Sequence, residues 1–113
     1  MSVLKNKLLS LNTSLPFMEG RDKGDLKEIL NTEVKVNAYG FLKDENGDYV
    51  VFSIQGTDNL FFFGGQVITH KFKAIEELFN SNEIEQLLME GINIILRERK
   101  SKNGRTYTEL EFI

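Results

Sequence analysis

Two stretches in which polar and apolar side chains alternate flank a stretch with helical spacing, and this arrangement constrains the fold most. Alternation begins at residue 33 and runs, with turns, to residue 63, and it returns over residues 92–113. A period of two is typical of strands with one buried face. Between these blocks, Phe72, Ile75, Leu78 and Phe79 recur at intervals of three and four, the spacing of one helix face. The sequence therefore predicts three strands, a helical segment and two more strands.

Turn residues mark the boundaries of these elements. Asn46-Gly47 predicts a tight hairpin between the first two strands. Gly64-Gly65 predicts a bend between the third strand and a helix that begins near Thr69 or His70. Asn82, with a glutamate three residues later, resembles a capping box that opens a second helical turn, and Gly91 ends it. The helical segment thus has two parts.

This order of elements is that of an OB fold, in which a helix plugs a barrel between strands three and four. We therefore expect a mainly β chain with α+β content, a five-stranded OB-type barrel over residues 33–113. An open five-stranded sheet with the helix across one face, or a small half-barrel, would fit the same pattern. Residues 1–32 are expected to form a partly flexible N-terminal arm with short helices. There Leu4, Leu8, Leu9 and Leu11 are expected to form a short helix or apolar arm, and Asp25 is expected to cap another helix.

Composition argues against catalysis. The chain has no cysteine and one histidine, His70, so it offers neither a thiolate metal site nor a histidine-based triad. Asp44, Asp48 and Asp58 would suit a magnesium-dependent nuclease, but all three lie in predicted turns without rigid positioning. We expect no catalytic residue, no metal and no cofactor. The chain has no run of 18 apolar residues, and its first residues carry lysines, so a cytoplasmic protein without a membrane partner is expected.

The positive charge gathers in one place. The net charge is −3, yet residues 91–113 hold five Lys or Arg against three acidic residues. All five cations fall in a predicted hairpin around the turn Lys102-Asn103-Gly104, and they are Arg97, Arg99, Lys100, Lys102 and Arg105. In an OB fold this hairpin is one of the loops that bind oligonucleotides, and cations there would neutralise phosphates. The alternative is a solvated hairpin whose lysines prevent the edge strand from pairing with another chain.

Aromatic residues supply the second candidate feature. If Val50 and Phe52 fill the core, the period of two turns Tyr49 outward, and Phe61 and Phe63 follow by the same rule. With Tyr107 on the hairpin and Tyr39, these rings would form a platform on which unstacked bases rest. The alternative is that the helices or the N-terminal arm cover this face.

Three motifs resemble the small OB-fold single-stranded DNA-binding proteins of phages and mobile elements of Gram-positive bacteria. They are Tyr49-Val50-Val51-Phe52-Ser53-Ile54, Phe61-Phe62-Phe63-Gly64-Gly65 and Lys100-Ser101-Lys102-Asn103-Gly104-Arg105-Thr106-Tyr107-Thr108. The resemblance covers residues 33–113 and implies sequence-tolerant coating of single strands during phage or mobile-element replication. Many such proteins end in an acidic tail, whereas this sequence ends within a predicted strand.

The sequence thus supports two functions. In the first, the chain binds single-stranded DNA, or RNA, as a monomer or a homo-oligomer. In the second, it is a protein-interaction module, a phage or plasmid factor that docks on a host replication or transcription protein through its acidic surface. The basic hairpin and the aromatic residues favour the first, and the overall negative charge favours the second.

Overall fold

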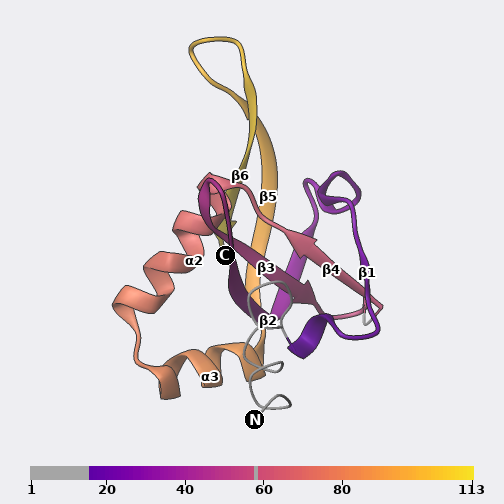
Figure 1. Cartoon of the computed structure of the whole chain (residues 1–113), viewed down its shortest axis with the longest axis vertical. Helices are drawn as coiled ribbons and strands as arrows, with labels where there is room; N and C mark the ends of the chain where they lie inside the picture. Colours follow the sequence, from indigo (N-terminus) through magenta and orange to yellow (C-terminus); the bar gives the residue numbers. More distant parts are fainter. Residues whose placement is uncertain (1–15, 58) are drawn as a thin grey trace.

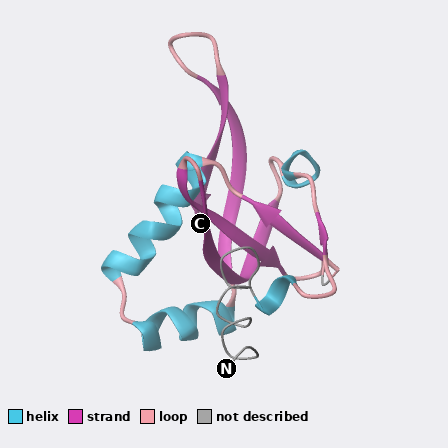
Figure 2. Ribbon diagram, in the orientation of Figure 1, coloured by secondary structure: helices cyan, strands magenta, loops and turns pink. Residues whose placement is uncertain are grey.

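A mixed six-stranded sheet with two helices packed against it forms the body of the chain (Figures 1 and 2). The computed structural model describes residues 16–57 and 59–113. The strands are β1 (Asp22–Lys23), β2 (Glu33–Asp44), β3 (Gly47–Ile54), β4 (Leu60–Phe63), β5 (Ile92–Lys100) and β6 (Thr106–Phe112). The helices are α2 (Gln66–Leu78) and α3 (Ser81–Glu90), with the short 3-10 helices η1 (Pro16–Met18) and η2 (Leu26–Ile29).

The predicted order of three strands, a helical segment and two strands is confirmed from β2 to β6. Across the sheet the strands lie in the order β1-β4-β3-β2-β5-β6. The long strand β2 is central, because it pairs antiparallel with β3 on one side and with β5 on the other. The chain is mainly β with a substantial helical part, as the sequence predicts.

The predicted closed, five-stranded barrel is wrong: the sheet is open and has a sixth strand. The extra strand β1 pairs parallel with β4, with Asp22 opposite Leu60 and Lys23 opposite Phe61. Closure would require the two end strands of the sheet to meet, but β1 occupies the outer edge of β4 instead. A two-residue strand is too short to show a period in its sequence. The charged, glycine-containing stretch around it is typical of a flexible linker. The sequence therefore gave no sign of this pairing.

The segment after β1 crosses the open side of the sheet. Gly24 donates its N–H to the Phe61 carbonyl at 2.7 Å, and a Cβ at this position would run into the Phe62 ring. The predicted cap is confirmed, since the Asp25 carboxylate accepts the Lys27 N–H at 3.0 Å and opens η2. Farther on, Asn31 donates its N–H to the Leu96 carbonyl at 2.7 Å. The segment thus links β4 to β5, while the leucines of residues 1–15 lie outside the described part of the chain.

The main hydrophobic core lies between the sheet and α2. The Phe72 ring of α2 packs against Phe52 of β3, with ring centroids 5.7 Å apart, and its edge meets Phe112 of β6 at 6.4 Å. Because β3 and β6 are separated in the sheet by β2 and β5, these contacts require the sheet to curve around α2. The helix therefore occupies the concave side of the open sheet.

The helix boundaries differ from the predicted ones by a few residues. Helix α2 begins at Gln66, with Gly65 as its N-cap, one turn before the predicted start. The capping box is present, but it joins Asn80 to Glu83, two residues earlier than predicted. Gly91 ends α3 with a positive φ of 87°, as expected. The earlier starts arise because the bend at Gly64 is fully packed and the chain turns at once into α2.

We predict that Gly64 and Gly65 respond differently to the same substitution. A Cβ at Gly64 would lie 2.5 Å from Val50 Cγ1 and 2.7 Å from Ile68 Cγ2, whereas nothing lies within 4 Å of one at Gly65. Gly64→Ala should therefore lower the free energy of unfolding by about 1–3 kcal/mol through overpacking. Gly65→Ala should cost less, about 1 kcal/mol or below, since only the helix cap changes. Urea denaturation of both variants measures the difference, and equal stabilities would contradict the packing at Gly64.

Candidate nucleic-acid interface

The β5–β6 hairpin projects well beyond the rest of the molecule (Figure 1). Its strands remain paired from Ile94 opposite Phe112 to Lys100 opposite Thr106, and the body of the chain covers only the first half. The turn at its tip is held by hydrogen bonds from Ser101 N–H to the Arg105 carbonyl, 2.8 Å, and from Gly104 N–H to the Ser101 carbonyl, 3.0 Å. This arm accounts for the elongated envelope of the chain, 51 × 33 × 29 Å.

The five predicted cations divide into two groups, of which the first is paired. Arg99 Nε lies 2.9 Å from Glu109 Oε2, and its Nη2 lies 3.9 Å from Glu111 Oε1. Arg97 Nε lies 3.7 Å from Glu111 Oε2, an ion pair too long for a hydrogen bond. The two carboxylates on β6 offset the two arginines. The sequence held the information for this, because pairing around the turn places both arginines on the same strand face as Glu109 and Glu111, within diagonal reach of them.

The second group lies at the tip and is unpaired within the described part of the chain. Lys100, Lys102 and Arg105 are all exposed, and no described acidic side chain lies within 4.0 Å of their charged groups. Lys100 lies on the opposite strand face from Arg99, since neighbouring residues alternate. The tip therefore carries three solvated positive charges on two sides of a narrow arm.

Tyr107 is the exposed aromatic residue of the hairpin. It lies directly opposite Arg99 in the β5–β6 pairing, and its side chain is 40% exposed. The strand faces of β6 are those expected, with Leu110 buried in the core and Tyr107 on the other side. A ring in this position is accessible to a base that approaches the tip.

The aromatic face around β4 is largely covered. Phe61 is 9% exposed and packs with Val51 and Leu42 in a second, smaller core. Phe17 and Met18 of η1 pack against this cluster from outside. The N-terminal segment thus covers part of the face that the sequence left open to bases. The role of Phe61 in stacking stays a prediction, but its ring is already packed.

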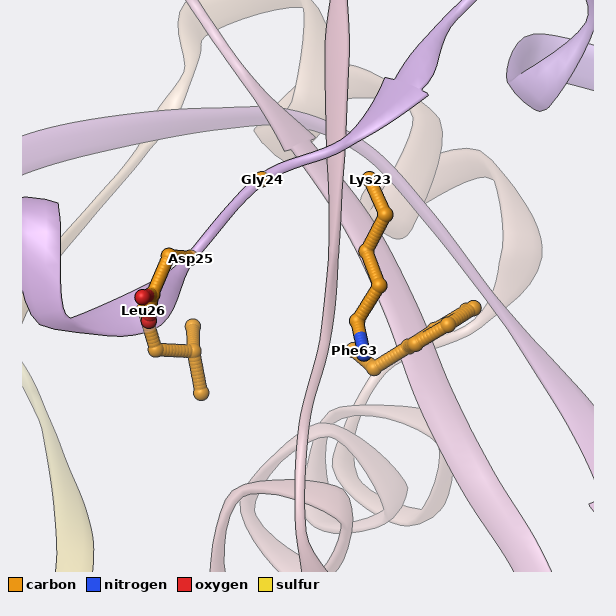
Figure 3. Close-up of a pocket in the computed structure, with 5 residues that line it drawn as sticks. All are labelled: Lys23, Gly24, Asp25, Leu26 and Phe63. Atoms are coloured by element: carbon orange, nitrogen blue, oxygen red, sulfur yellow. The ribbon is translucent and has the colours of Figure 1, made fainter.

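Tyr49 and Phe63 are half-buried at the rim of the same cluster. Their rings meet edge to face at 5.5 Å, and Phe63 also contacts Phe61 at 5.3 Å. The Lys23 ammonium lies 5.2 Å from the centre of the Phe63 ring (Figure 3). This is within the range of a cation–π contact. Phe63 is therefore held between β3 and the edge strand β1.

Tyr39 lies on the other face of the sheet. An irregularity in the β2–β3 register between Val36 and Ala38 turns Tyr39 toward α2. Its hydroxyl donates to Glu76 Oε1 at 3.1 Å. Burial raises the pKa of this hydroxyl above its ordinary value, and the Glu76 carboxylate raises it further. Tyr39 thus belongs to the contact between β2 and α2 and lies apart from Tyr49 and Phe63.

Two adjoining hollows lie between Phe63 and the hairpin. The first, about 470 Å³, is lined by Lys23, Gly24, Asp25, Leu26 and Phe63 (Figure 3). The second, about 260 Å³, is lined by eight residues, namely Asp25, Leu26, Lys27, Leu30, Glu98, Thr106, Tyr107 and Thr108. Both share Asp25 and Leu26, so they adjoin at the start of η2. Lys23 and Lys27 line these hollows and so belong to the candidate interface. The sequence did not predict them, because the charged, glycine-containing region that forms β1 and η2 resembles a flexible linker.

Two of the three carboxylates considered for metal chemistry, Asp44 and Asp48, are engaged in other contacts. Asp44 accepts the N–H of Asn46 at 2.8 Å within the β2–β3 turn. Asp48 pairs with Lys73 at 2.9 Å, and this hydrogen bond lowers the pKa of the Asp48 carboxyl. Asp58 lies outside the described residues. In residues 16–57 and 59–113, no three side chains of the metal-binding types gather in one place. None of the described helices has the length and apolar character to cross a membrane.

Comparison with known proteins gives no relative: no family model, no curated protein and no solved structure matches this chain.

We predict that alanine substitutions at Phe61 and Tyr107 have different effects on the free energy of unfolding. Phe61→Ala should lower the free energy of unfolding by about 3 kcal/mol, because a buried ring leaves a cavity between η1 and the sheet. Tyr107→Ala should change it by less than about 0.5 kcal/mol, as for other exposed positions. Chemical denaturation of the two variants is the measurement. If Phe61→Ala were as stable as the parent chain, the second core would not contribute as the packing indicates.

Proposed function

We propose that this chain binds single-stranded nucleic acid, single-stranded DNA in the first instance, through the tip of the β5–β6 hairpin and the adjoining hollows. On this proposal it coats single strands in phage or mobile-element replication. The observation that carries the proposal is the group of three cations, Lys100, Lys102 and Arg105, that have no acidic partner among the described residues and lie on an arm that projects from an otherwise acidic chain. Such an arm attracts phosphates while the body repels them.

The arrangement of strands supports this proposal. The order of elements from β2 to β6, with helices between β4 and β5, agrees with the order expected of an OB fold, although the sheet is open. In that fold the β5–β6 loop is one of the two loops that close on an oligonucleotide. The concave sheet curved around α2 agrees with this interpretation.

Aromatic rings at both ends of the hollows supply stacking surfaces. Tyr107 lines the hollow beside the hairpin, and Phe63 lines the one beside β1. Lys23 and Lys27 lie between them and offer charge to the phosphates that connect successive bases. Bases stacked on such rings contribute about 1–3 kcal/mol each. The same arrangement would also serve single-stranded RNA, whose bases present the same π-faces.

Acidic groups along the path do not abolish the attraction. The Asp25 carboxylate is engaged by the Lys27 N–H at 3.0 Å. Glu98 faces the hollow without a described ion pair, but Lys100, Lys102 and Arg105 at the tip, which have no acidic partner among the described residues, outnumber this one acidic residue. The local field is therefore positive, although the net charge is −3.

One observation favours the second function, a protein-interaction module. Leu78 at the end of α2 is 77% exposed, and Phe79 and Phe112 near it are also exposed. Exposed apolar groups that cluster in this way mark interaction sites. A fluorescence titration with an oligonucleotide of mixed sequence discriminates the two, since an interaction module alone would show no saturable binding.

We predict that two lysines at the tip determine the affinity and its salt dependence. With three phosphate contacts, the logarithm of the affinity should fall against log salt with a slope of about −2. Lys100→Glu combined with Lys102→Glu should weaken binding at every sequence and make the slope shallower. The control is Lys35→Glu combined with Lys43→Glu, two exposed positions on β2 that give the same change in net charge. Equal loss in both double variants would show a general charge effect and remove the hairpin from the interface.

We predict that Tyr107 provides the preference for single strands. Phosphate contacts serve duplexes and single strands alike, but only single strands present unstacked bases. Tyr107→Ala should therefore weaken single-strand binding by about 5- to 150-fold and leave the weak attraction to duplex DNA unchanged. Tyr107→Phe keeps the ring and should bind as the parent chain does. If both variants behaved alike, stacking at this position would be excluded.

A further inference from the structure

An apolar groove lies between α2, α3 and the end of β6. Its volume is about 420 Å³, and its apolar lining includes Ile75, Leu78, Phe79, Leu87, Phe112 and Ile113. Leu78 and Ile113 are 77% and 57% exposed. A monomer seldom leaves large apolar side chains clustered around an open groove. The groove therefore fits an apolar partner.

The helices that form the groove carry more negative than positive charge, although Lys71 of α2 is among the residues that line it. Residues 74–91, which cover the second half of α2 and all of α3, contain five glutamates and no lysine or arginine. All five glutamates are exposed. A partner that combines apolar side chains with positive charge and lacks acidic groups would be matched in both respects.

The first fifteen residues of the chain, which lie outside the described part, have this chemistry. Leu4, Leu8 and Leu11 recur at intervals of four and three, the spacing that places side chains on one face of a helix. We call this set the leucine stripe. Lys5 and Lys7 supply positive charge, and residues 1–15 contain no aspartate or glutamate. An amphipathic helix laid in an apolar groove is a common mode of recognition.

The groove and the point where this segment joins the described chain lie on opposite faces of the sheet. Phe17 and Met18 of η1 pack with Val51 on the outer face, whereas α2 packs with Phe52 on the inner one. If Leu4 to Leu11 were helical, residues 12–15 would span at most about 14 Å. The sheet and α2 form two layers of about 10 Å each, so this link is too short to reach the groove of the same chain. The segment of a second copy has no such restriction.

We infer that the groove between α2, α3 and the end of β6 receives the leucine stripe of a second copy of this chain. Because the segment and the groove are different surfaces, the contact is heterologous, and it links copies head to tail into an open chain. The inference does not depend on nucleic-acid binding. Where the proposed function holds, such a chain would place successive copies along one strand and make coating cooperative.

Disulfide trapping tests this contact in the full chain, which contains no cysteine of its own. Leu8→Cys and Leu78→Cys are made in separate preparations, mixed without nucleic acid and oxidised mildly. We expect a disulfide-linked heterodimer in the mixture, well above the homodimers that either preparation forms alone. Asn103→Cys, exposed at the hairpin tip, replaces Leu78→Cys as the control partner and should give only the background.

Three outcomes would overturn the inference. The first is a heterodimer yield equal to that of the Asn103→Cys control. The second is preferential pairing of Leu8→Cys with itself. The third is a disulfide within one chain when both cysteines are placed in the same molecule at high dilution, which would show that the segment binds its own groove.

A charge substitution provides an independent measurement. Leu8→Asp should lower the association constant between copies, measured by sedimentation, by about tenfold or more, because a buried leucine is lost. Asn6→Asp adds the same charge on the helix face opposite the stripe and is the matched control. An equal effect of the two substitutions would contradict docking through the leucines. Since no nucleic acid is present, the result is separate from that of the oligonucleotide titrations.

Discussion

The packing of Phe72 between β3 and β6 is the contact on which the rest of this structure depends. Its ring joins Phe52 and Phe112, which belong to strands separated by two others in the sheet. Hydrogen bonding alone would leave a flatter twisted sheet, and the burial of this ring draws its two sides toward α2. A buried Phe contributes roughly 1.5–3 kcal/mol by transfer alone. The curvature that separates the outer face, the groove and the hairpin follows from this packing.

The pairing of β1 with β4 is the second contact that determines the arrangement of the sheet. It occupies the edge at which the sheet would otherwise have closed, and it brings η1 against the outer aromatic cluster. It also carries Lys23 to Phe63 and leads into η2 beside β5. The candidate interface is thus assembled from a segment before the predicted domain and a hairpin at its far end.

Charge is separated along the molecule in a way that supports two different contacts. The hairpin tip is basic, whereas the groove formed by α2 and α3 is flanked by glutamates. Arg97 and Arg99 do not add to the positive tip, because Glu109 and Glu111 pair with them at the middle of the hairpin. The tip attracts phosphates, whereas the groove is mainly apolar and lies between helices with a net negative charge. The two surfaces are therefore suited to different partners.

The sequence by itself determined the order of the elements and most of the turns. Period two and period 3.6 are local properties, and Gly91 and Gly104 adopt the positive φ that few other residues tolerate. It also determined which hairpin carries the cations, and the register around that turn already implied that Arg97 and Arg99 share a strand face with Glu109 and Glu111. Only the tertiary structure decided that the sheet stays open, that η1 covers Phe61, and that Tyr39 faces α2. These outcomes depend on contacts between segments distant in sequence, and on a register irregularity, about which the local pattern of side chains carries no information.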